Sequence, residues 1–302
     1  MRFVLLAAIL ALTACAPTYV VLPDANAEAT TQAARGAPII FAESYTLHSA
    51  VLGDAREINV WVPPDYDENA ERRYNVVYVI DGGLDQDFVH IAGLGALGAL
   101  SWTYEPLIIV GVRTNDRRHE LTPPATDPRY VQEFPNAGGA GDFRRYLQTE
   151  LIPFIEARYR TGARRAVAGE SLAGLFIVDT LLAQPGLFSD YIAISPSLWW
   201  DDRAMARRAG DLARAQNYAE KRLFLAVANE GGTMQDGIDR VRAALAQTEL
   251  EMRYSDRSAT ETHATIYHNA TLDALRWLYP MPPYDGETPW FMIEGAAPPA
   301  PQ

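Results

Sequence analysis

The sequence contains one cysteine in 302 residues, so the chain can form neither an intrachain disulfide nor a cysteine-based metal site. Basic residues are also scarce: lysine and arginine together number 26, against 38 aspartates and glutamates. No cluster of basic residues forms a stripe, which disfavours a role in nucleic-acid binding. The net charge of −12 is sufficient to keep the chain dispersed in water.

Long apolar runs are absent except at the N-terminus, where residues 1–15 read MRFVLLAAILALTAC. This stretch is too short to span a bilayer and is typical of a signal peptide. Its end, Leu12 to Cys15, resembles a bacterial lipobox, which predicts that Cys15 is lipidated and becomes the first residue of the mature chain. The alternatives are an ordinary secretory signal or a buried thiol. Ala16 favours an outer-membrane location facing the periplasm.

The segment that follows, residues 16–38, is rich in alanine, threonine and proline and has no periodicity. It predicts a flexible tether between the membrane and the folded domain. Residues 286–302 form a similar tail. Hydrophobic content of 48% is ordinary for a globular protein, and we expect one catalytic domain over residues 39–285.

Within that domain, alternating segments at 44–52 and 56–64 predict an antiparallel hairpin. Continuous apolar runs then predict buried strands at 74–81, 105–112, 164–169, 191–196, 221–230 and 250–255. Helical spacing of apolar residues appears at 141–159, 172–182, 201–216, 237–249 and 270–279. Strands that alternate with helices indicate an α/β fold with a mostly parallel sheet covered on both faces.

One polar pair interrupts the apolar stretch AVAGESLAGLF at residues 166–176. A phosphate loop requires a lysine here, and a dinucleotide fingerprint requires a third glycine; both are missing. The remaining interpretation is a nucleophile elbow, a tight strand-to-helix turn that presents Ser171. The small residues Gly169 and Ala173 let the helix pass close to the strand, although the usual motif has glycine at the second place.

An elbow predicts that a carboxylate and then a histidine follow the serine in the chain. Three of the five histidines precede it and are excluded by that order: His48, His90 and His119. Of the other two, His263 in a polar loop is preferred to His268 at the entry to the last helix. The acid should end the preceding strand, where Glu230 is followed by two glycines.

Asp236 and Asp239 are rival acids, but they lie where a helix should begin and where acids are common for capping reasons.

At this point the strings YVIDGG, GESLAGLF, SPSLWW and ETHATIYH, followed by LRWLY, resemble the putative-esterase family of α/β-hydrolases. The likeness runs in order from about Leu47 to Tyr279 and is greatest for the siderophore (enterobactin) esterase-like branch; S-formylglutathione hydrolases belong to the same family. It implies an α/β-hydrolase fold with Ser171 as nucleophile and His263 as base. The acid varies across the family, so Glu230 rests on its position in the chain.

The tetrahedral oxyanion needs two donors. One is the N–H of Leu172, the residue after the nucleophile. The resemblance implies Gly83 as the other, with Gly82 close behind; the alternative is that this pair only permits a turn. Trp199 and Trp200 follow the next strand, and two interpretations stay open for them: pocket wall or core packing.

The sequence therefore predicts a serine hydrolase of carboxylic esters that acts on a small-molecule substrate, a siderophore trilactone-type ester among the candidates. It needs no cofactor and no metal. The alternatives are an acyltransferase or peptidase that uses the same serine, and an inactive binding lipoprotein. The intact order of serine, acid and histidine argues against the inactive form.

Overall fold

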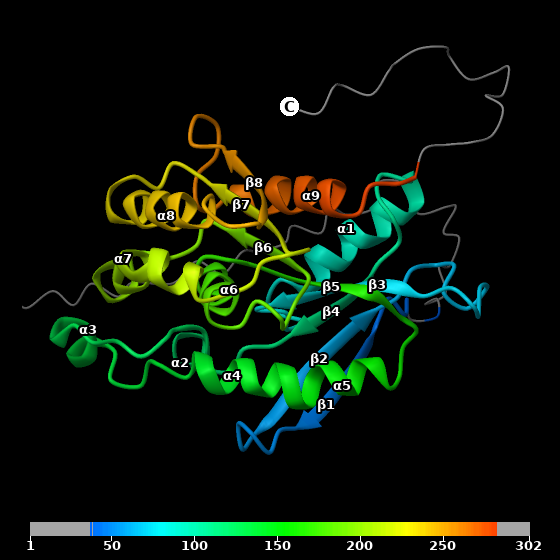
Figure 1. The fold of residues 1–302 in the computed structure, drawn as a ribbon. Coiled ribbons are helices and arrows are strands. Elements are labelled where there is room, and N and C mark those ends of the chain that lie inside the picture. The colour runs from blue at the N-terminus through cyan, green and yellow to red at the C-terminus, as the bar shows by residue number, and fades with distance from the viewer. Residues whose placement is uncertain (1–36, 38, 283–302) are drawn as a thin grey trace, which may run out of the picture. The chain divides into compact units, whose positions relative to one another are not determined.

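The computed structural model describes residue 37 and residues 39–282 (Figure 1). The predicted signal peptide with Cys15, nearly all of the predicted tether and the predicted tail at 286–302 lie outside the described residues. Residues 283–285, the end of the predicted domain, lie outside them too. Among the residues described, no helix combines the length and the apolar character that crossing a bilayer requires.

Over residues 39–282 one eight-stranded sheet forms the centre of the fold, with the strand order β1-β2-β4-β3-β5-β6-β7-β8. The strands are β1 (Glu43–His48), β2 (Ala55–Trp61), β3 (Tyr74–Ile80), β4 (Ile108–Val112), β5 (Thr161–Glu170), β6 (Asp190–Ile194), β7 (Arg222–Val227) and β8 (Glu251–Asp256). The pairs β1–β2 and β2–β4 are antiparallel, and the other pairs are parallel. The predicted hairpin and the mostly parallel sheet are confirmed.

The central strands are apolar on both faces because helices cover both sides of the sheet. In β3, Val76, Tyr78 and Ile80 contribute to one core, whereas Val77 and Val79 contribute to the other. Continuous burial of this kind is expected of parallel strands, and it explains why the sequence shows unbroken apolar runs.

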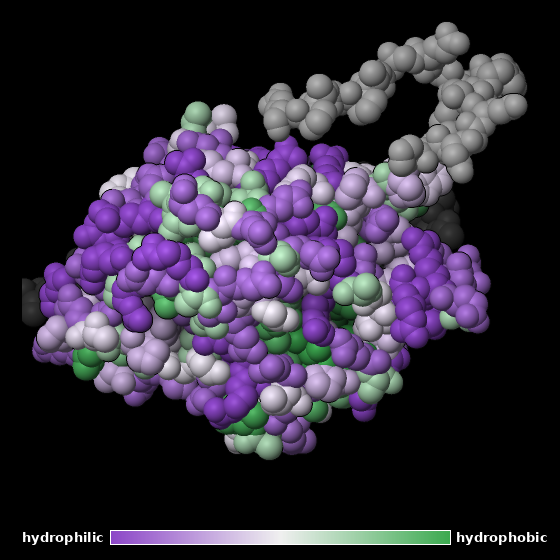
Figure 2. All heavy atoms as spheres, in the orientation of Figure 1, coloured by the Kyte–Doolittle hydropathy of each residue, from purple (hydrophilic) through white to green (hydrophobic). Residues whose placement is uncertain are grey.

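Helices α1 (Phe88–Ser101) and α9 (Ile266–Leu278) pack in one of these cores. The other core is shared by α4 (Ala140–Tyr146), the π-helical segment η1 (Leu147–Leu151), α5 (Ile152–Glu156), α6 (Leu172–Ala183), α7 (Trp200–Arg214) and α8 (Gly232–Leu245). The short helices α2 (Arg117–Leu121) and α3 (Pro128–Glu133) follow β4. Hydrophilic side chains cover most of the face seen in Figure 2.

Three helices were not predicted: α1, α2 and α3. The last two have only five and six residues, too few for a periodic pattern to show. Helix α1 is long, but its sequence FVHIAGLGALGALS has no aspartate, glutamate, lysine or arginine and contains three glycines. Apolar residues all round the helix leave no amphipathic period to recognise.

Candidate active site

Ser171 occupies a strained turn between β5 and α6. Its backbone has φ 62° and ψ −117°, a conformation that non-glycine residues rarely adopt. Hydrogen bonds from Ser171 N to Ile194 O (3.0 Å) and from Ser197 N to Ser171 O (3.0 Å) hold the turn against the end of β6. Strain of this kind, fixed by its surroundings, is characteristic of functional turns and of the nucleophile elbow in particular.

The elbow also explains the alanine that departs from the usual motif. A Cβ placed on Gly169 would lie 2.5 Å from the Cβ of Ala173, so only one of these two positions can carry a methyl group. A Cβ added to Gly174, the next residue, would lie 2.9 Å from Ile194 O and 3.0 Å from the Cα of Pro196. The glycine at 169 therefore makes Ala173 tolerable, and the helix still passes close to the strand.

A pocket of about 340 Å³ opens at the carboxyl ends of the parallel strands and gathers the predicted catalytic residues. Its lining includes five residues singled out from the sequence: Ser171, Leu172, Trp199, Glu230 and His263. It also includes four that were not: Arg117, Arg118, Ser197 and Met234. Segments that are far apart in the chain thus meet in one pocket.

Glu230 and His263 are paired in this pocket. His263 Nδ1 lies 2.8 Å from Glu230 Oε1, and the side chain of Glu230 is only 8% exposed while that of His263 is 44% exposed. Glu230 follows β7, and His263 lies in the loop after β8, so neighbouring strands bring the two together. An imidazole held at Nδ1 in this way presents its Nε2 to a reacting group.

The rival residues lie elsewhere. Asp236, on the first turns of α8, pairs with Arg203 at 2.8 Å and with Arg240 at 2.9 Å. Asp239, also on α8, accepts a hydrogen bond from Gln235 at 3.1 Å. Neither aspartate lines the pocket of Ser171.

His268 lies on α9, where its Nδ1 is 3.1 Å from His90 Nε2 on α1, and it does not line the pocket either.

The hydroxyl of Ser171 is oriented toward Ser197. The two Oγ atoms are 3.2 Å apart, and within the described part of the chain this is the hydrogen bond that Ser171 Oγ makes. His263 lines the same pocket, and no hydrogen bond joins it to Ser171 Oγ among the described residues. Catalytic hydrogen bonds are often long or poorly aligned before a substrate binds, so this arrangement is compatible with a serine that turns toward the histidine on binding.

The two predicted oxyanion donors differ in their surroundings. Leu172 is the first residue of α6, so its N–H has no acceptor within the helix and points out of the helix N-terminus. The N–H of Gly83 donates to Gln86 Oε1 at 2.9 Å, and Gly83 is not part of the pocket lining. The N–H of Gly82 donates to Val112 O at 2.8 Å.

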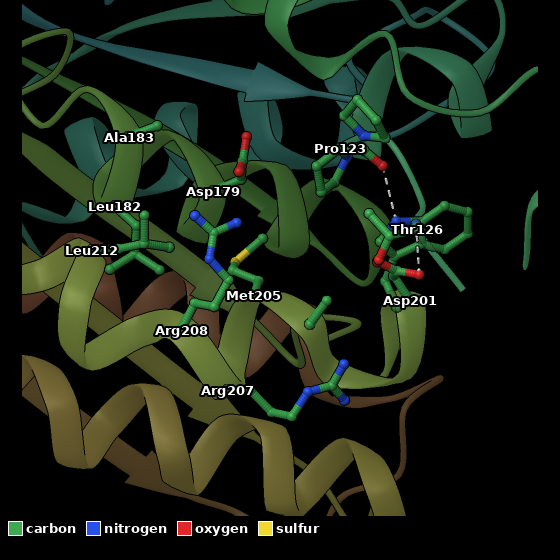
Figure 3. A pocket seen from close by; sticks show the side chains of 13 residues that line it. Pro123, Thr126, Asp179, Leu182, Ala183, Asp201, Met205, Arg207, Arg208 and Leu212 are labelled. Carbon is green, nitrogen blue, oxygen red and sulfur yellow. Dashed lines mark hydrogen bonds between the residues drawn. The ribbon is translucent and has the colours of Figure 1, made fainter. Parts of the chain in front are cut away.

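The two neighbouring tryptophans lie in different surroundings. Trp199 lines the pocket of Ser171, whereas Trp200 is 3% exposed and its Nε1 donates to Pro123 O at 2.9 Å. Trp200 lines a second cavity of about 430 Å³ between α6 and α7. Figure 3 shows that cavity, with Thr126 and Asp201 at one end and Leu182 and Leu212 at the other.

The two arginines of the pocket were not singled out from the sequence. Arg117 is fixed by Asp81, with Nε 2.6 Å from Oδ2, and by a 3.3 Å hydrogen bond to Glu170 O. The guanidinium of Arg118 lies 4.0 Å from the centre of the Phe134 ring. The available signal was the polar stretch TNDRRHE directly after the buried strand β4, at the edge of the sheet where ligands collect.

Two half-buried carboxyl groups lie beside the elbow. Burial raises the pKa of Glu170 to about 7, against an opposing effect of His263. Burial, with a smaller contribution from Asp81, raises the pKa of Asp87 to about 6. Near neutral pH this region therefore holds less negative charge than its composition suggests.

No group of three or more histidine, cysteine, aspartate or glutamate residues placed to hold a metal occurs in the part of the chain that the structure describes.

Comparison with known proteins places this site in a family. The family model described as "Putative esterase" matches residues 49–277, which include all three residues of the predicted triad. The chain is 34% identical over 109 residues to the ferri-bacillibactin esterase BesA of Bacillus subtilis. That match covers 32% of this chain and 38% of the relative, so it spans about two fifths of the relative's length.

Solved structures agree with the fold. An IroE-like serine hydrolase from Shewanella oneidensis is 29% identical, with a TM-score of 0.68 over 79% of this chain and 80% of the other. The BES protein from Bacillus cereus is 22% identical, with a TM-score of 0.69 over 82% of this chain and 99% of the other, a likeness in fold alone.

Proposed function

The chain belongs to the putative esterase family, and from this premise we propose that it is a serine hydrolase that cleaves carboxylic esters through an acyl-enzyme intermediate. One observation carries the proposal. A serine on a left-handed strand-to-helix turn shares a pocket with a histidine whose Nδ1 is hydrogen-bonded to a buried glutamate.

In the proposed reaction, Ser171 Oγ attacks the ester carbonyl while His263 Nε2 takes its proton. Glu230 holds the imidazole in the tautomer that accepts at Nε2 and stabilises the imidazolium that forms. The imidazolium then gives the proton to the leaving alkoxide, and the alcohol departs. Water, activated by the same histidine, attacks the acyl-serine and releases the carboxylic acid and free Ser171.

The developing oxyanion is proposed to bind the N–H of Leu172, where the N-terminus of α6 adds a favourable dipole. Gly83 is the proposed second donor, as the family resemblance implies. Its N–H now bonds Gln86, so in this proposal the glutamine side chain is displaced when substrate binds.

The substrate that we propose is an ester with anionic or strongly accepting groups close to the scissile bond, of which a siderophore trilactone is one class. Two features support it. Arg117 and Arg118 bring positive charge to the pocket of a chain whose net charge is −12. The relative from Bacillus subtilis is named as a ferri-bacillibactin esterase.

We also propose that Cys15 carries lipid and holds the domain at the bacterial envelope, on the periplasmic face of the outer membrane. The support is the lipobox-like ending at residues 12–15 and the tether-like composition that follows. Detergent partitioning of cell envelopes tests it. Wild type should enter the membrane fraction, whereas the Cys15→Ala variant should appear in the soluble fraction. If both stay soluble, the lipid anchor is ruled out.

The proposed activity is tested with p-nitrophenyl esters of graded chain length and with ferric and iron-free catecholate trilactones. We expect wild type to hydrolyse esters and Ser171→Ala to lose the activity. If neither class of ester is cleaved faster by wild type than by Ser171→Ala, the proposal is wrong. A preference for trilactones that disappears in an Arg117→Gln, Arg118→Gln variant would support the role given to the arginines.

A further inference from the structure

Helix α1 exposes apolar side chains to an unusual degree. Among the described residues, nine large apolar side chains are strongly exposed, and five of them lie between positions 84 and 102: Leu84, Val89, Leu97, Leu100 and Trp102. Leu100 is 79% exposed and Trp102 is 75% exposed.

The exposed residues of α1 form one face of the helix. Val89, Gly93, Leu97 and Leu100 are spaced three or four residues apart and are all exposed, while Ile91, Leu94 and Gly98 on the other side are buried. His90 is the only titratable residue of the helix. A helix that is apolar all round requires a cover on its outer side as well as on its inner side. We call these apolar side chains, Val89, Leu97 and Leu100, together with the exposed Trp102 at the C-cap of the helix, the α1 face.

We propose that the α1 face docks onto a lipid bilayer, with Leu97, Leu100 and Trp102 entering the region between headgroups and acyl chains. The face is a ridge and not a groove, since none of the cavities described above is lined by a residue of α1. A bilayer accepts protruding apolar side chains without a matching site. Tryptophan at the end of an apolar helix is typical of residues that settle at the membrane interface.

The path of the chain also favours a bilayer. Phe41, where the described domain begins, packs against Trp61 with the ring centroids 6.4 Å apart. Trp61 in turn lies against Gly95 of α1, where an added Cβ would come within 3.0 Å of the indole. Phe41, the first residue of the folded unit, is therefore linked to α1 through the ring of Trp61.

The lipidation of Cys15 proposed above, on which this step rests, would leave roughly 25 residues between the lipid and Phe41; a linker of that length spans roughly 25–30 Å when it behaves as a random coil. A tether of this length keeps the domain at high effective concentration near the bilayer, so even a weak apolar face would be occupied. The residues of the α1 face do not line the pocket of Ser171.

The test places a probe on the face in the full chain. Leu100→Cys and, as a matched control, Val131→Cys on α3 are labelled with a thiol-reactive, environment-sensitive fluorophore; Val131 is also an exposed apolar residue, at 49%. Wild type treated in parallel reports any labelling at Cys15. The labelled proteins are reconstituted into phosphatidylcholine vesicles. Quenching of the fluorophore by aqueous iodide is then compared between the protein in vesicles and the same protein in detergent-free buffer without vesicles.

We expect vesicles to shift the emission at position 100 to shorter wavelength and to lower its iodide quenching by roughly twofold or more, since interfacial helices bury their apolar face in the acyl boundary. Position 131 should not change. Equal quenching at positions 100 and 131 in vesicles would overturn the proposal. Protection of position 100 without vesicles would also overturn it, because the C-terminal segment or a second copy would then cover the face. A chain that fails to bind vesicles would overturn it as well.

Thermal unfolding midpoints of both variants close to wild type show that labelling has left the fold intact. None of these readouts depends on ester hydrolysis, so they stand whether or not the proposed activity is found.

Discussion

Glu230 Oε1 lies 2.8 Å from His263 Nδ1, although 33 residues separate the two in the chain. The contact forms because β7 and β8 are parallel neighbours whose carboxyl ends point to the same edge of the sheet. The side chain of Glu230 is 8% exposed and has an imidazole as its partner, whereas Asp236 and Asp239 on α8 are 37% and 48% exposed and have arginines as theirs.

The first prediction follows from that pair. Glu230→Gln should lower kcat by roughly 10²–10⁴-fold with little change in KM, because the glutamine no longer stabilises the imidazolium that forms in the transition state. The fold should persist, as judged by circular dichroism. Steady-state kinetics with a p-nitrophenyl ester measure the effect.

Asp236→Asn and Asp239→Asn are the matched controls and should remain near wild type, since their contacts are with residues of α7 and α8 at the surface. If Glu230→Gln keeps most of its activity while one of the controls abolishes it, the acid has been assigned to the wrong residue. If none of the three matters, Ser171 and His263 act as a dyad.

The second prediction concerns the elbow. Gly169→Ala places a methyl group 2.5 Å from Ala173 Cβ, which forces the strand and α6 apart. Overpacking of this kind costs about 1–3 kcal/mol, and displacing a nucleophile by about 1 Å can cost roughly 100-fold in kcat. Urea unfolding and kcat measure the two effects.

Gly186→Ala serves as the control, because its added Cβ meets nothing within 4 Å. Adding Ala173→Gly to Gly169→Ala should restore much of the stability and activity, since it removes the clashing methyl group. A double variant as impaired as Gly169→Ala alone would show that the contact between these two positions is not what sets the elbow.

The third prediction is a dependence of stability on pH. Burial raises the pKa of Glu170 from 4.5 to about 7, so the folded state binds this proton more tightly than the unfolded state does. The stability that Glu170 contributes is therefore present below its unfolded pKa and is lost as the pH rises from about 4.5 to about 7. Glu170→Gln, which stays neutral, should gain stability relative to wild type between pH 5 and pH 8.

Because Glu170 is partly open to solvent, we expect a relative gain on the order of 1–2 kcal/mol, or roughly 2–6 °C in Tm. Asp85→Asn is the control: Asp85 is exposed and its hydrogen bond with Arg113 lowers its pKa, so its effect should be the same at pH 5 and pH 8. A difference between Glu170→Gln and wild type that does not change with pH would contradict the assignment.

Much of the fold could be predicted because buried parallel strands leave unbroken apolar runs and surface helices leave a regular spacing. The runs at Val76–Ile80 and Ile108–Val112 became β3 and β4 for that reason. Helix α1 could not be predicted in the same way, because its outer face is as apolar as its inner face and no period remains.

The residues of the site likewise fall into those that the sequence could indicate and those that it could not. Chain order and turn chemistry are visible in the sequence, so they pointed to Ser171, Glu230 and His263, which the structure brings together in one pocket. Trp199 and Trp200 are adjacent and identical, and their different surroundings, the pocket of Ser171 for one and the carbonyl of Pro123 for the other, arise from tertiary contacts. Arg117 is brought to the pocket by a contact with Asp81 that crosses between two strand ends, which sequence patterns do not reveal.

The central claim is that Ser171 is the covalent nucleophile, and the most direct measurement is mass spectrometry of the protein after treatment with a fluorophosphonate probe. Wild type should carry one phosphonyl group on the peptide that contains Ser171, and His263→Ala should react much more slowly because the serine keeps its proton. Ser171→Ala should carry none, while Ser197→Ala, which removes the hydroxyl 3.2 Å away, should still be labelled at Ser171. Equal labelling of wild type and Ser171→Ala, or an adduct on Ser197 in wild type, would contradict the account.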